Sequence, residues 1–377
     1  MTRLAAADLR ALRRSDQPLV SISLAAVQEN FLNLTEIASA NGAYTSAVLK
    51  ADAYGLGMQQ VAPVLWKVGA RVFFVAHLSE ALELRQILPD AAIYVLSGLN
   101  RYELSVYSHY RLIPVLNQLS EIELWLGHAA SKADKIPAAV HIDTGMARLG
   151  LDEQDIRKLK EKAELLSAFS PLLYLTHLAS AEMKACETNL IQFGNFKEAI
   201  SGLPLGQQSI ANSSGCFLPS DYALDLVRPG AAIYGINPTP ERSNPMTPVV
   251  SLRAPILQTR TIAKGDVVGY GSTWTAKNKT RIATISIGYA DGLLRSLSNT
   301  GRIFIDGVPC PIVGRVSMDL ITVEVTHLRP EQSMTGVQAE IIGPNQTLDD
   351  IGESGGTIGY EILTSLGNRF ARTYVDL

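Results

Sequence analysis

Short apolar runs alternate with helical patterns from about residue 45 to residue 235 of this chain. The helical stretches include residues 79–87, with Ala81, Leu84 and Leu88 on one face, and residues 152–169. Continuous apolar runs are typical of parallel strands that are covered on both faces. We predict eight strands, at residues 46–50, 71–77, 92–97, 112–117, 138–143, 172–177, 208–212 and 223–228. Eight strand–helix units in about 200 residues predict an α/β fold, a (β/α)8 TIM-type barrel.

The pattern changes after about residue 247, where short β-branched segments are separated by turn residues such as Gly265-Asp266 and Asp306-Gly307. We predict strands at residues 249–258, 267–269, 281–287, 302–305, 308–314, 319–325 and 338–342. The barrel is therefore expected in residues 1–247 and a mostly β C-terminal domain in residues 248–377. Residues 18–24 resemble a strand that precedes the barrel, and we expect them to pair with the C-terminal domain.

Composition excludes several classes of protein. Charged residues make up 18% and hydrophobic residues 47% of the chain, which predicts a large core and a subunit interface. A net charge of -3 offers no broad attraction for nucleic acid or anionic membranes. Cys186, Cys216 and Cys310 lack metal-ligand spacing, so we expect reduced thiols and no metal site. The arginine-rich N-terminus is unlike a signal peptide, so we expect a cytoplasmic protein.

Most of the predicted strands end in a polar or ionisable residue, and the carboxyl ends of barrel strands carry the chemistry in this fold. These residues are Lys50, His77, Ser97, Asn117, Asp143, His177, Asn212 and Arg228. For His77, Ser97 and Asn117 we prefer a simple polar strand end. For His177, a core histidine bonded to a carbonyl is an equally good interpretation. Lys50 precedes a turn of small residues, an arrangement that suits a Schiff base to a carbonyl cofactor, although a lone lysine there is usually a solvated strand end.

Two loops of small residues follow the seventh and eighth predicted strands. They are Asn212-Ser213-Ser214-Gly215 and Arg228-Pro229-Gly230-Ala231-Ala232. In barrels of this type such loops often bind phosphate through backbone amides and a helix N-terminus. Ser213 adds a hydroxyl, and Gly230 and Ala231 allow close approach of the backbone. A phosphate site together with a Schiff-base lysine indicates pyridoxal phosphate.

Five segments resemble alanine racemase, a family of fold-type III pyridoxal-phosphate enzymes. They are Ala47-Val48-Leu49-Lys50-Ala51-Asp52-Ala53-Tyr54-Gly55-Leu56-Gly57, Asp143-Thr144-Gly145-Met146-Ala147-Arg148-Leu149-Gly150, Arg228-Pro229-Gly230 with Tyr234-Gly235, Gly288-Tyr289-Ala290-Asp291-Gly292 and Gly314-Arg315-Val316-Ser317-Met318-Asp319. The resemblance extends in the same order from about Val20 to the C-terminus. It implies interconversion of L- and D-alanine, which supplies D-alanine for peptidoglycan. It also implies a head-to-tail homodimer whose active sites combine the barrel of one subunit with the β domain of the other.

The resemblance assigns roles to individual residues. Lys50 would bind the cofactor and act as the base toward D-alanine, and Tyr289 from the partner subunit would be the base toward L-alanine. A free phenol keeps its proton at neutral pH, so Tyr289 needs activation, for which His177, bridging to Arg228, is the candidate. Arg228 would face the pyridine nitrogen. The phosphate would be held by Tyr54, Ser213, Gly230, Ala231 and Tyr360.

Arg148 and the backbone amide of Met318 would bind the substrate carboxylate, with Asp319 positioning its loop. His141 departs from the family pattern, because many members have a carbamylated lysine there. Either a chloride or another anion fills the gap, or hydrogen bonds alone hold Arg148, and our hypothesis is an anion near His141 and Arg148. Ser317 replaces a common cysteine, and we assign no function to Ala147.

Several alternatives remain open at this level. A racemase for serine or of broader specificity would share the same segments, and so would a biosynthetic or a catabolic enzyme. A pyridoxal-phosphate homeostasis protein is a single barrel, so the predicted β domain argues against it. A decarboxylase of the same fold normally places a carboxylate at the ring nitrogen, where this chain has Arg228.

Overall fold

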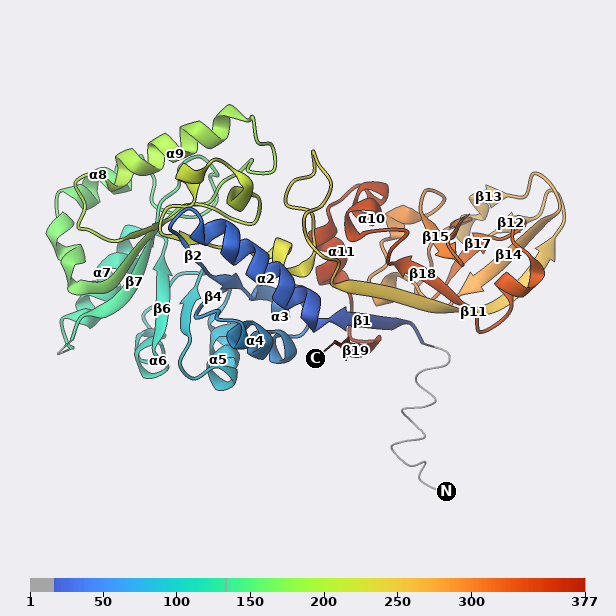
Figure 1. Ribbon diagram of the computed structural model, residues 1–377, viewed down its shortest axis with the longest axis horizontal. Helices are drawn as coiled ribbons and strands as arrows, with labels where there is room; N and C mark the ends of the chain where they lie inside the picture. Colours follow the sequence, from blue (N-terminus) through green and yellow to red (C-terminus); the bar gives the residue numbers. More distant parts are fainter. Residues whose placement is uncertain (1–16, 133, 377) are drawn as a thin grey trace, which may run out of the picture. The chain divides into compact units, whose positions relative to one another are not determined.

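The computed structural model describes residues 17–132 and 134–376, which divide into two units (Figure 1). We call residues 27–247 the barrel unit, and residues 248–377 together with residues 1–26 the β unit. The expectation for the arginine-rich N-terminus falls on residues 1–16 and lies outside the described residues.

Eight parallel strand positions follow one another in chain order in the barrel unit. One sheet contains β3 (Ala47–Val48), β4 (Val72–Val75), β5 (Ala92–Val95), β6 (Leu112–Leu116), β7 (Ile136–His141), β8 (Phe169–Leu175) and β9 (Gln207–Ser209). The eighth strand, β10 (Leu226–Val227), pairs in parallel with β2 (Tyr44–Thr45), which directly precedes β3. Backbone hydrogen bonds from Asp225 to Gln208 and from Arg228 to Ala211 join the β10 segment to the β9 segment. The predicted α/β barrel fold is confirmed.

Helices cover the outside of these strands, as Figure 1 shows. They are α2 (Leu24–Ser39), α4 (Met58–Lys67), α5 (Leu78–Ile87), α6 (Leu104–His109), α7 (Leu119–Ala129), α8 (Glu153–Lys160) and α9 (Glu187–Ile200). Phe73, Phe74 and Val75 of β4 are completely buried, as expected for a strand with both faces covered. The burial of whole strands explains why the apolar runs are continuous.

The strands are shorter than predicted at their carboxyl ends, and after β4 and β6 a side chain from the next helix binds the backbone there. The Glu80 carboxylate accepts the N–H groups of Ala76 and His77, which follow β4, at 2.7 and 3.0 Å. Glu121 accepts the N–H of Asn117, after β6, at 2.7 Å. These amides therefore bond to a carboxylate instead of to a neighbouring strand.

The helix predicted over residues 152–169 is wrong in its second half. The α8 helix ends at Lys160, a 3-10 segment covers Ala163–Ala168, and β8 begins at Phe169. Ser170 precedes Pro171, and a residue before proline favours extended backbone, so the chain enters the strand here.

The β unit is built around β11 (Val250–Ile262), which pairs antiparallel with β1 (Leu19–Ser23). In Figure 1 the blue β1 therefore belongs with strands from the far end of the sequence, and it also pairs in parallel with β19 (Ala371–Val375). The other strands are β12 (Val267–Val268), β13 (Trp274–Thr275), β14 (Thr280–Ile285), β15 (Arg302–Ile305), β16 (Val308–Pro311), β17 (Ile321–Glu324) and β18 (Gln338–Ile342).

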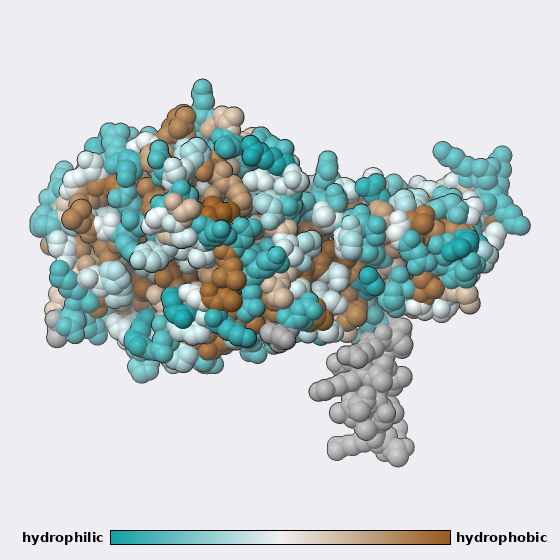
Figure 2. Space-filling model, in the orientation of Figure 1, coloured by the Kyte–Doolittle hydropathy of each residue, from teal (hydrophilic) through white to brown (hydrophobic). Residues whose placement is uncertain are grey.

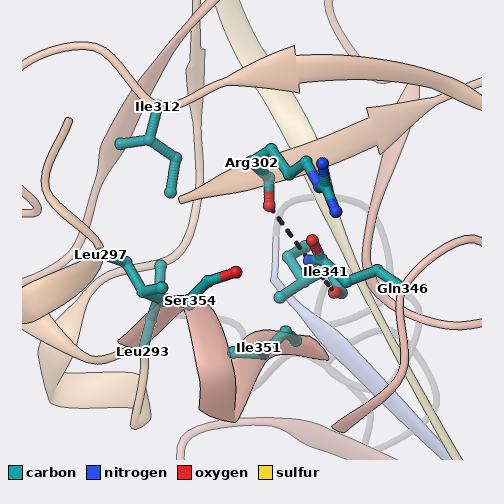
Figure 3. A pocket seen from close by; sticks show the side chains of 8 residues that line it. All are labelled: Leu293, Leu297, Arg302, Ile312, Ile341, Gln346, Ile351 and Ser354. Carbon is teal, nitrogen blue, oxygen red and sulfur yellow. Dashed lines mark hydrogen bonds between the residues drawn. The ribbon is translucent and has the colours of Figure 1, made fainter. Parts of the chain in front are cut away.

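Two helices of the β unit were not predicted, α10 (Leu348–Gly355) and α11 (Gly359–Ser365). Thr347 and Asp350 form a capping box at the start of α10, a signal that is present in the sequence. Beside α10 lies a cavity of about 10 Å³, lined mainly by aliphatic side chains (Figure 3). The Gln346 amide points toward it from bonds to the carbonyls of Arg302 and Ile341. A space of this volume holds about one water, so it is not a substrate site.

Hydrophilic residues cover much of the face shown in Figure 2, with smaller hydrophobic patches between them. No helix within residues 17–132 and 134–376 is both long enough and apolar enough to cross a bilayer. Cys186, Cys216 and Cys310 all have free thiols, and the last two are buried.

Candidate active site

Lys50 begins a turn, α3 (Lys50–Gly55), instead of ending a strand as predicted. The four residues from Ala51 to Tyr54 all have φ between 54° and 57°, so they form a left-handed turn without glycine. Left-handed backbone costs an L-residue about 1–2 kcal/mol. Such strain persists only where surrounding contacts hold it, and it is concentrated at functional sites.

Two carboxylates hold the turn that follows Lys50. Glu80 accepts the Ala51 N–H at 2.6 Å, with the same carboxylate that binds the end of β4. Asp52 accepts the Met58 N–H at 2.6 Å, at the start of α4. Burial lowers the pKa of Lys50, and the Arg148 charge lowers that pKa further, while Glu80 opposes the shift. A larger fraction of the Lys50 amine is therefore neutral than for a solvated lysine.

The two loops predicted to bind phosphate lie together and contact the Lys50 turn. The Ser213 hydroxyl oxygen accepts the N–H groups of Gly230 and Ala232 at 3.0 and 3.2 Å. Gly230 lies so close to Tyr54 that a Cβ at this position would overlap the tyrosine hydroxyl. Ala231 is buried at the start of the 3-10 segment Ala231–Tyr234. Hydroxyls and backbone amides are thus gathered at one place.

Arg228 is 6% exposed, and neutral oxygens bind its guanidinium. One terminal nitrogen donates to the Thr176 carbonyl at 2.5 Å, and the other donates to the Ser209 hydroxyl. Burial lowers the pKa of Arg228 to about 10, so it keeps its charge at neutral pH. Because these two partners are neutral, the charge of Arg228 remains available to an electron-rich ligand.

His141 and His177 are both neutral at physiological pH. Burial, followed by the charge of Arg228, lowers the pKa of His141 to about 4 and the pKa of His177 to about 3. Arg148 lowers both pKa values as well. A neutral imidazole keeps one nitrogen as a hydrogen-bond acceptor. A neutral His141 adds no charge of its own for binding an anion beside Arg148.

Asn117 determines which nitrogen of His141 carries the proton. The Asn117 amide nitrogen donates to the carbonyls of Leu96 and Val115 at 3.1 and 3.0 Å, so its oxygen must face His141. That oxygen lies 2.7 Å from Nδ1 of His141, which therefore donates. Nε2 of His141 is left as the acceptor. Asn117 is thus more than the polar strand end that the sequence suggested.

Asp143 shapes the loop that carries Arg148. Its Oδ1 accepts the N–H groups of Gly145, Met146 and Ala147 at 2.9, 2.9 and 3.1 Å. Ala147 has a φ of 55°, a left-handed conformation that suits glycine better than alanine. The side chain of Arg148 is exposed, and its charge acts on Lys50, His141 and His177.

The residues at the carboxyl end of the barrel strands form a site that we call the barrel mouth. It consists of Lys50, Tyr54, His141, Arg148, His177, Ser213, Arg228 and Gly230. The nearby carboxylates of Glu80 and Asp143 each accept three backbone N–H groups, and that of Asp52 accepts the Met58 N–H. An amine, hydroxyls, backbone amides and two guanidinium groups fit a ligand with a phosphate and a carbonyl group.

The remaining predicted site residues belong to the β unit. Tyr289 is 44% exposed and Met318 is 53% exposed. Their loops are joined by backbone hydrogen bonds of 3.0 Å, from Tyr289 to Ser317 and from Ala290 to Met318. Tyr360 lies in the first turn of α11.

Sequence analysis missed Glu80, as well as Arg369 of the β unit, and it gave Asn117 no role beyond a polar strand end. A weak signal existed for Glu80, because a glutamate at the third position of a helix can cap the preceding backbone. No comparable signal existed for Arg369, because its partners lie in other loops.

Known proteins share both the sequence and the fold of this chain. Two family models match, "Alanine racemase, N-terminal domain" over residues 22–238 and "Alanine racemase, C-terminal domain" over residues 249–374. An alanine racemase of Methylobacterium nodulans is 46% identical over 95% of this chain and 96% of its own length. A catabolic alanine racemase of Agrobacterium fabrum is 45% identical over 95% of this chain and 92% of its own.

Solved structures of alanine racemases also resemble this chain. Alanine racemase from Bartonella henselae, with covalently bound pyridoxal phosphate, has a TM-score of 0.92 and 39% identity, covering 95% of this chain and 99% of that one. The biosynthetic alanine racemase of Pseudomonas aeruginosa has a TM-score of 0.89 and 30% identity, covering 96% of this chain and 100% of that one. Since family models match both units and relatives align over nearly the whole length, the chain belongs to the alanine racemase family.

Proposed function

We propose that this protein interconverts L- and D-alanine with pyridoxal phosphate, by a two-base mechanism in a homodimer. The observation that carries the proposal is the barrel mouth, where Lys50 and its left-handed turn lie against the loops of Ser213 and Gly230. The covalently bound pyridoxal phosphate of the Bartonella henselae relative supports the choice of cofactor.

The residues of this chain suit each part of that cofactor. Lys50 would bind its carbonyl carbon, and Arg228 would face its ring nitrogen. Its phosphate would be held by Tyr54, Ser213, Gly230, Ala231 and Tyr360. When bound, pyridoxal phosphate withdraws electrons and so weakens the Cα–H bond of the amino acid attached to it.

Arg228 would act through its permanent charge. Its guanidinium is held by a carbonyl and a hydroxyl, so its orientation does not depend on a carboxylate. A cation against the ring nitrogen keeps that nitrogen from taking up a proton, which limits electron withdrawal. Limited withdrawal favours rapid return of the proton to Cα over side reactions. A decarboxylase of this fold would instead place a carboxylate here.

Lys50 and Tyr289 would exchange the Cα proton on opposite faces of the substrate. The lowered pKa of Lys50 increases the fraction of neutral amine that can accept a proton. His177 is neutral, so it has an acceptor nitrogen for the phenolic proton of Tyr289. Arg148 and the amide of Met318 would orient the substrate carboxylate.

A second subunit would supply Tyr289 and Met318 to each barrel mouth. The exposure of both side chains supports this assignment, because a residue that completes a partner's site must be accessible on its own subunit. The low charged fraction of the chain is also compatible with an interface. Sedimentation or light scattering of the purified protein would measure the dimer directly.

The decisive experiment incubates the purified, cofactor-loaded protein with L-alanine, L-serine and several larger amino acids. Chiral chromatography then quantifies the D-isomer of each. We expect alanine to approach equal amounts of both isomers faster than any other amino acid. Absence of alanine racemisation by protein that contains the cofactor would refute the proposal, and faster turnover of serine would reassign the substrate.

We also propose that the product D-alanine supplies peptidoglycan synthesis. Relatives include both an enzyme named biosynthetic and one named catabolic, so the cellular role needs its own test. Deleting the gene should make growth dependent on added D-alanine if the role is biosynthetic. Normal growth with impaired use of D-alanine as a nutrient would indicate a catabolic role.

A further inference from the structure

Two loops of the β unit carry Tyr289, assigned above as one of the two bases, and Met318, assigned above to the substrate carboxylate. We call residues 286–293 the Tyr289 loop and residues 313–320 the Met318 loop. Besides their two backbone hydrogen bonds, they meet at Gly288, where a Cβ would overlap the carbonyls of Ser317 and Met318. Glycine is therefore required at position 288 for the two loops to approach this closely. The loops touch along their backbones, while the side chains of Tyr289 and Met318 remain exposed.

Arg369 connects the same two loops through their carboxylates. Its Nε lies 3.3 Å from Oδ1 of Asp291 in the Tyr289 loop. A terminal nitrogen of the same guanidinium lies 2.8 Å from Oδ1 of Asp319 in the Met318 loop. The planar guanidinium presents its N–H groups in fixed directions, so it holds the two carboxylates at a defined separation.

Asp291 transmits this contact to the backbone beside Tyr289. Its side chain is 4% exposed, and its second oxygen accepts the Gly288 N–H at 2.9 Å. The backbone carbonyl of Asp291 also accepts the N–H of Gly367 at 3.4 Å, in the loop that carries Arg369. Asp291 therefore links Arg369 to the peptide that precedes Tyr289.

We propose that Arg369 is a positioning residue, which bridges Asp291 and Asp319 so that the Tyr289 hydroxyl and the Met318 amide reach the substrate as one unit. This inference rests on the proposed function. Arg369 and Asp319 are 52% and 55% exposed, so their ion pair contributes about 0–1 kcal/mol to stability. The Arg369–Asp319 contact therefore acts mainly through geometry, and a displacement of about 1 Å can cost up to about 100-fold in rate.

The test measures loss of deuterium from the Cα position of L- and D-alanine, which reports proton abstraction from each isomer separately. Arg369→Gln should slow wash-out from L-alanine, the isomer assigned to Tyr289, by about 10- to 100-fold. Wash-out from D-alanine, assigned to Lys50, should fall much less. The KM for both isomers should rise, because the Met318 amide loses its position.

Matched variants separate positioning from general damage. Arg329→Gln removes a more exposed ion pair of the β unit, with Glu331 at 3.2 Å, and should change none of these values. Asp319→Asn should raise KM without selective loss of wash-out from L-alanine. In a Tyr289→Phe background, Arg369→Gln should slow turnover far less than it does alone, since part of its effect acts through Tyr289.

Equal loss of wash-out from both isomers together with a lower melting temperature would overturn the inference, because it indicates a merely structural residue. The inference would also be overturned if Arg369→Gln gave the same wash-out rates and KM values as Arg329→Gln. If Arg369→Gln fails to fold, Arg369→Lys, which keeps the charge without the guanidinium fork, is judged by the same criteria. Absence of wash-out from both isomers in the unmodified, cofactor-loaded protein would instead refute the proposed function.

Discussion

The barrel mouth and the two loops of the β unit hold their functional groups in different ways. In the barrel mouth, Arg228 is buried, and the strained Lys50 turn is held by hydrogen bonds from backbone N–H groups to side-chain carboxylates. In the β unit, Tyr289 and Met318 are about half exposed, and backbone contacts together with Arg369 hold their loops. The first arrangement fixes side chains by burial, whereas the second fixes the backbone and leaves the side chains accessible.

This difference follows from what each region is proposed to do. A buried cation loses hydration, so Arg228 is stable only where oxygens replace the lost water. Such a site can be completed within one folding unit. Groups that act on a second subunit must instead remain at the surface until the subunits associate. The comparison therefore predicts that barrel-mouth variants affect cofactor binding, whereas variants of the Tyr289 loop affect proton transfer alone.

Lys50→Ala should have the largest effect. We expect activity to fall by about 10⁴-fold or more, because both the covalent attachment and one base are lost. The visible absorbance of the bound cofactor should disappear from the purified protein. Retention of that absorbance at its normal intensity would break the assignment of cofactor attachment to the barrel mouth.

Tyr289→Phe should lower racemisation by about 10²- to 10⁴-fold and leave cofactor absorbance unchanged. Since the two isomers have equal free energy, kcat/KM must fall equally in both directions, and overall rates cannot identify the missing base. Deuterium wash-out can identify it: we expect loss from L-alanine to stop while loss from D-alanine continues. Wash-out from L-alanine that survives the substitution would mean that a different group is the base.

The buried histidines of the barrel mouth should make stability depend on pH. The pKa values of His141 and His177 in the folded protein, about 4 and 3, lie below the value of about 6.5 for an unfolded chain. The contribution of these neutral histidines to folding stability is thus fully present above pH 6.5, and it is lost as the pH falls toward 4. Each histidine changes the free energy of unfolding by at most about 1.4 kcal/mol per pH unit. Urea unfolding between pH 5 and pH 7.5 should show a smaller slope for His141→Gln, with His327→Gln of the β unit as the control.

Ala147→Gly should have the smallest effect, a gain of about 1 kcal/mol in the free energy of unfolding. Glycine adopts the left-handed conformation at position 147 without the strain of a Cβ. Denaturant titration would measure the gain, and kinetic constants should change little if Asp143 holds the loop that carries Arg148. A loss of stability would show that the Ala147 methyl group makes a contact worth more than the strain.

The order of elements followed from the sequence because it depends on local pattern. Continuous apolar runs identified the eight barrel strands, and β-branched segments between turns identified most of the β unit. The motif around Lys50 and the loops at Ser213 and Gly230 likewise indicated a cofactor site, because they combine reactive and small residues within a few positions. The hydrophobic pattern predicted the ends of strands less accurately. After β4 and β6, the side chains of Glu80 and Glu121 from the following helices bind the backbone.

The sequence by itself determined that this chain alternates strands and helices, changes to β-strands near residue 248 and carries the segments of its family. Only the tertiary structure decided that Ala51 to Tyr54 turn left-handed, that Asn117 sets the proton of His141 and that Arg369 joins Asp291 to Asp319. Hydrophobic periodicity reports which side of an element is buried. It carries no information on which distant polar groups will meet, because those contacts are set by the packing of whole elements.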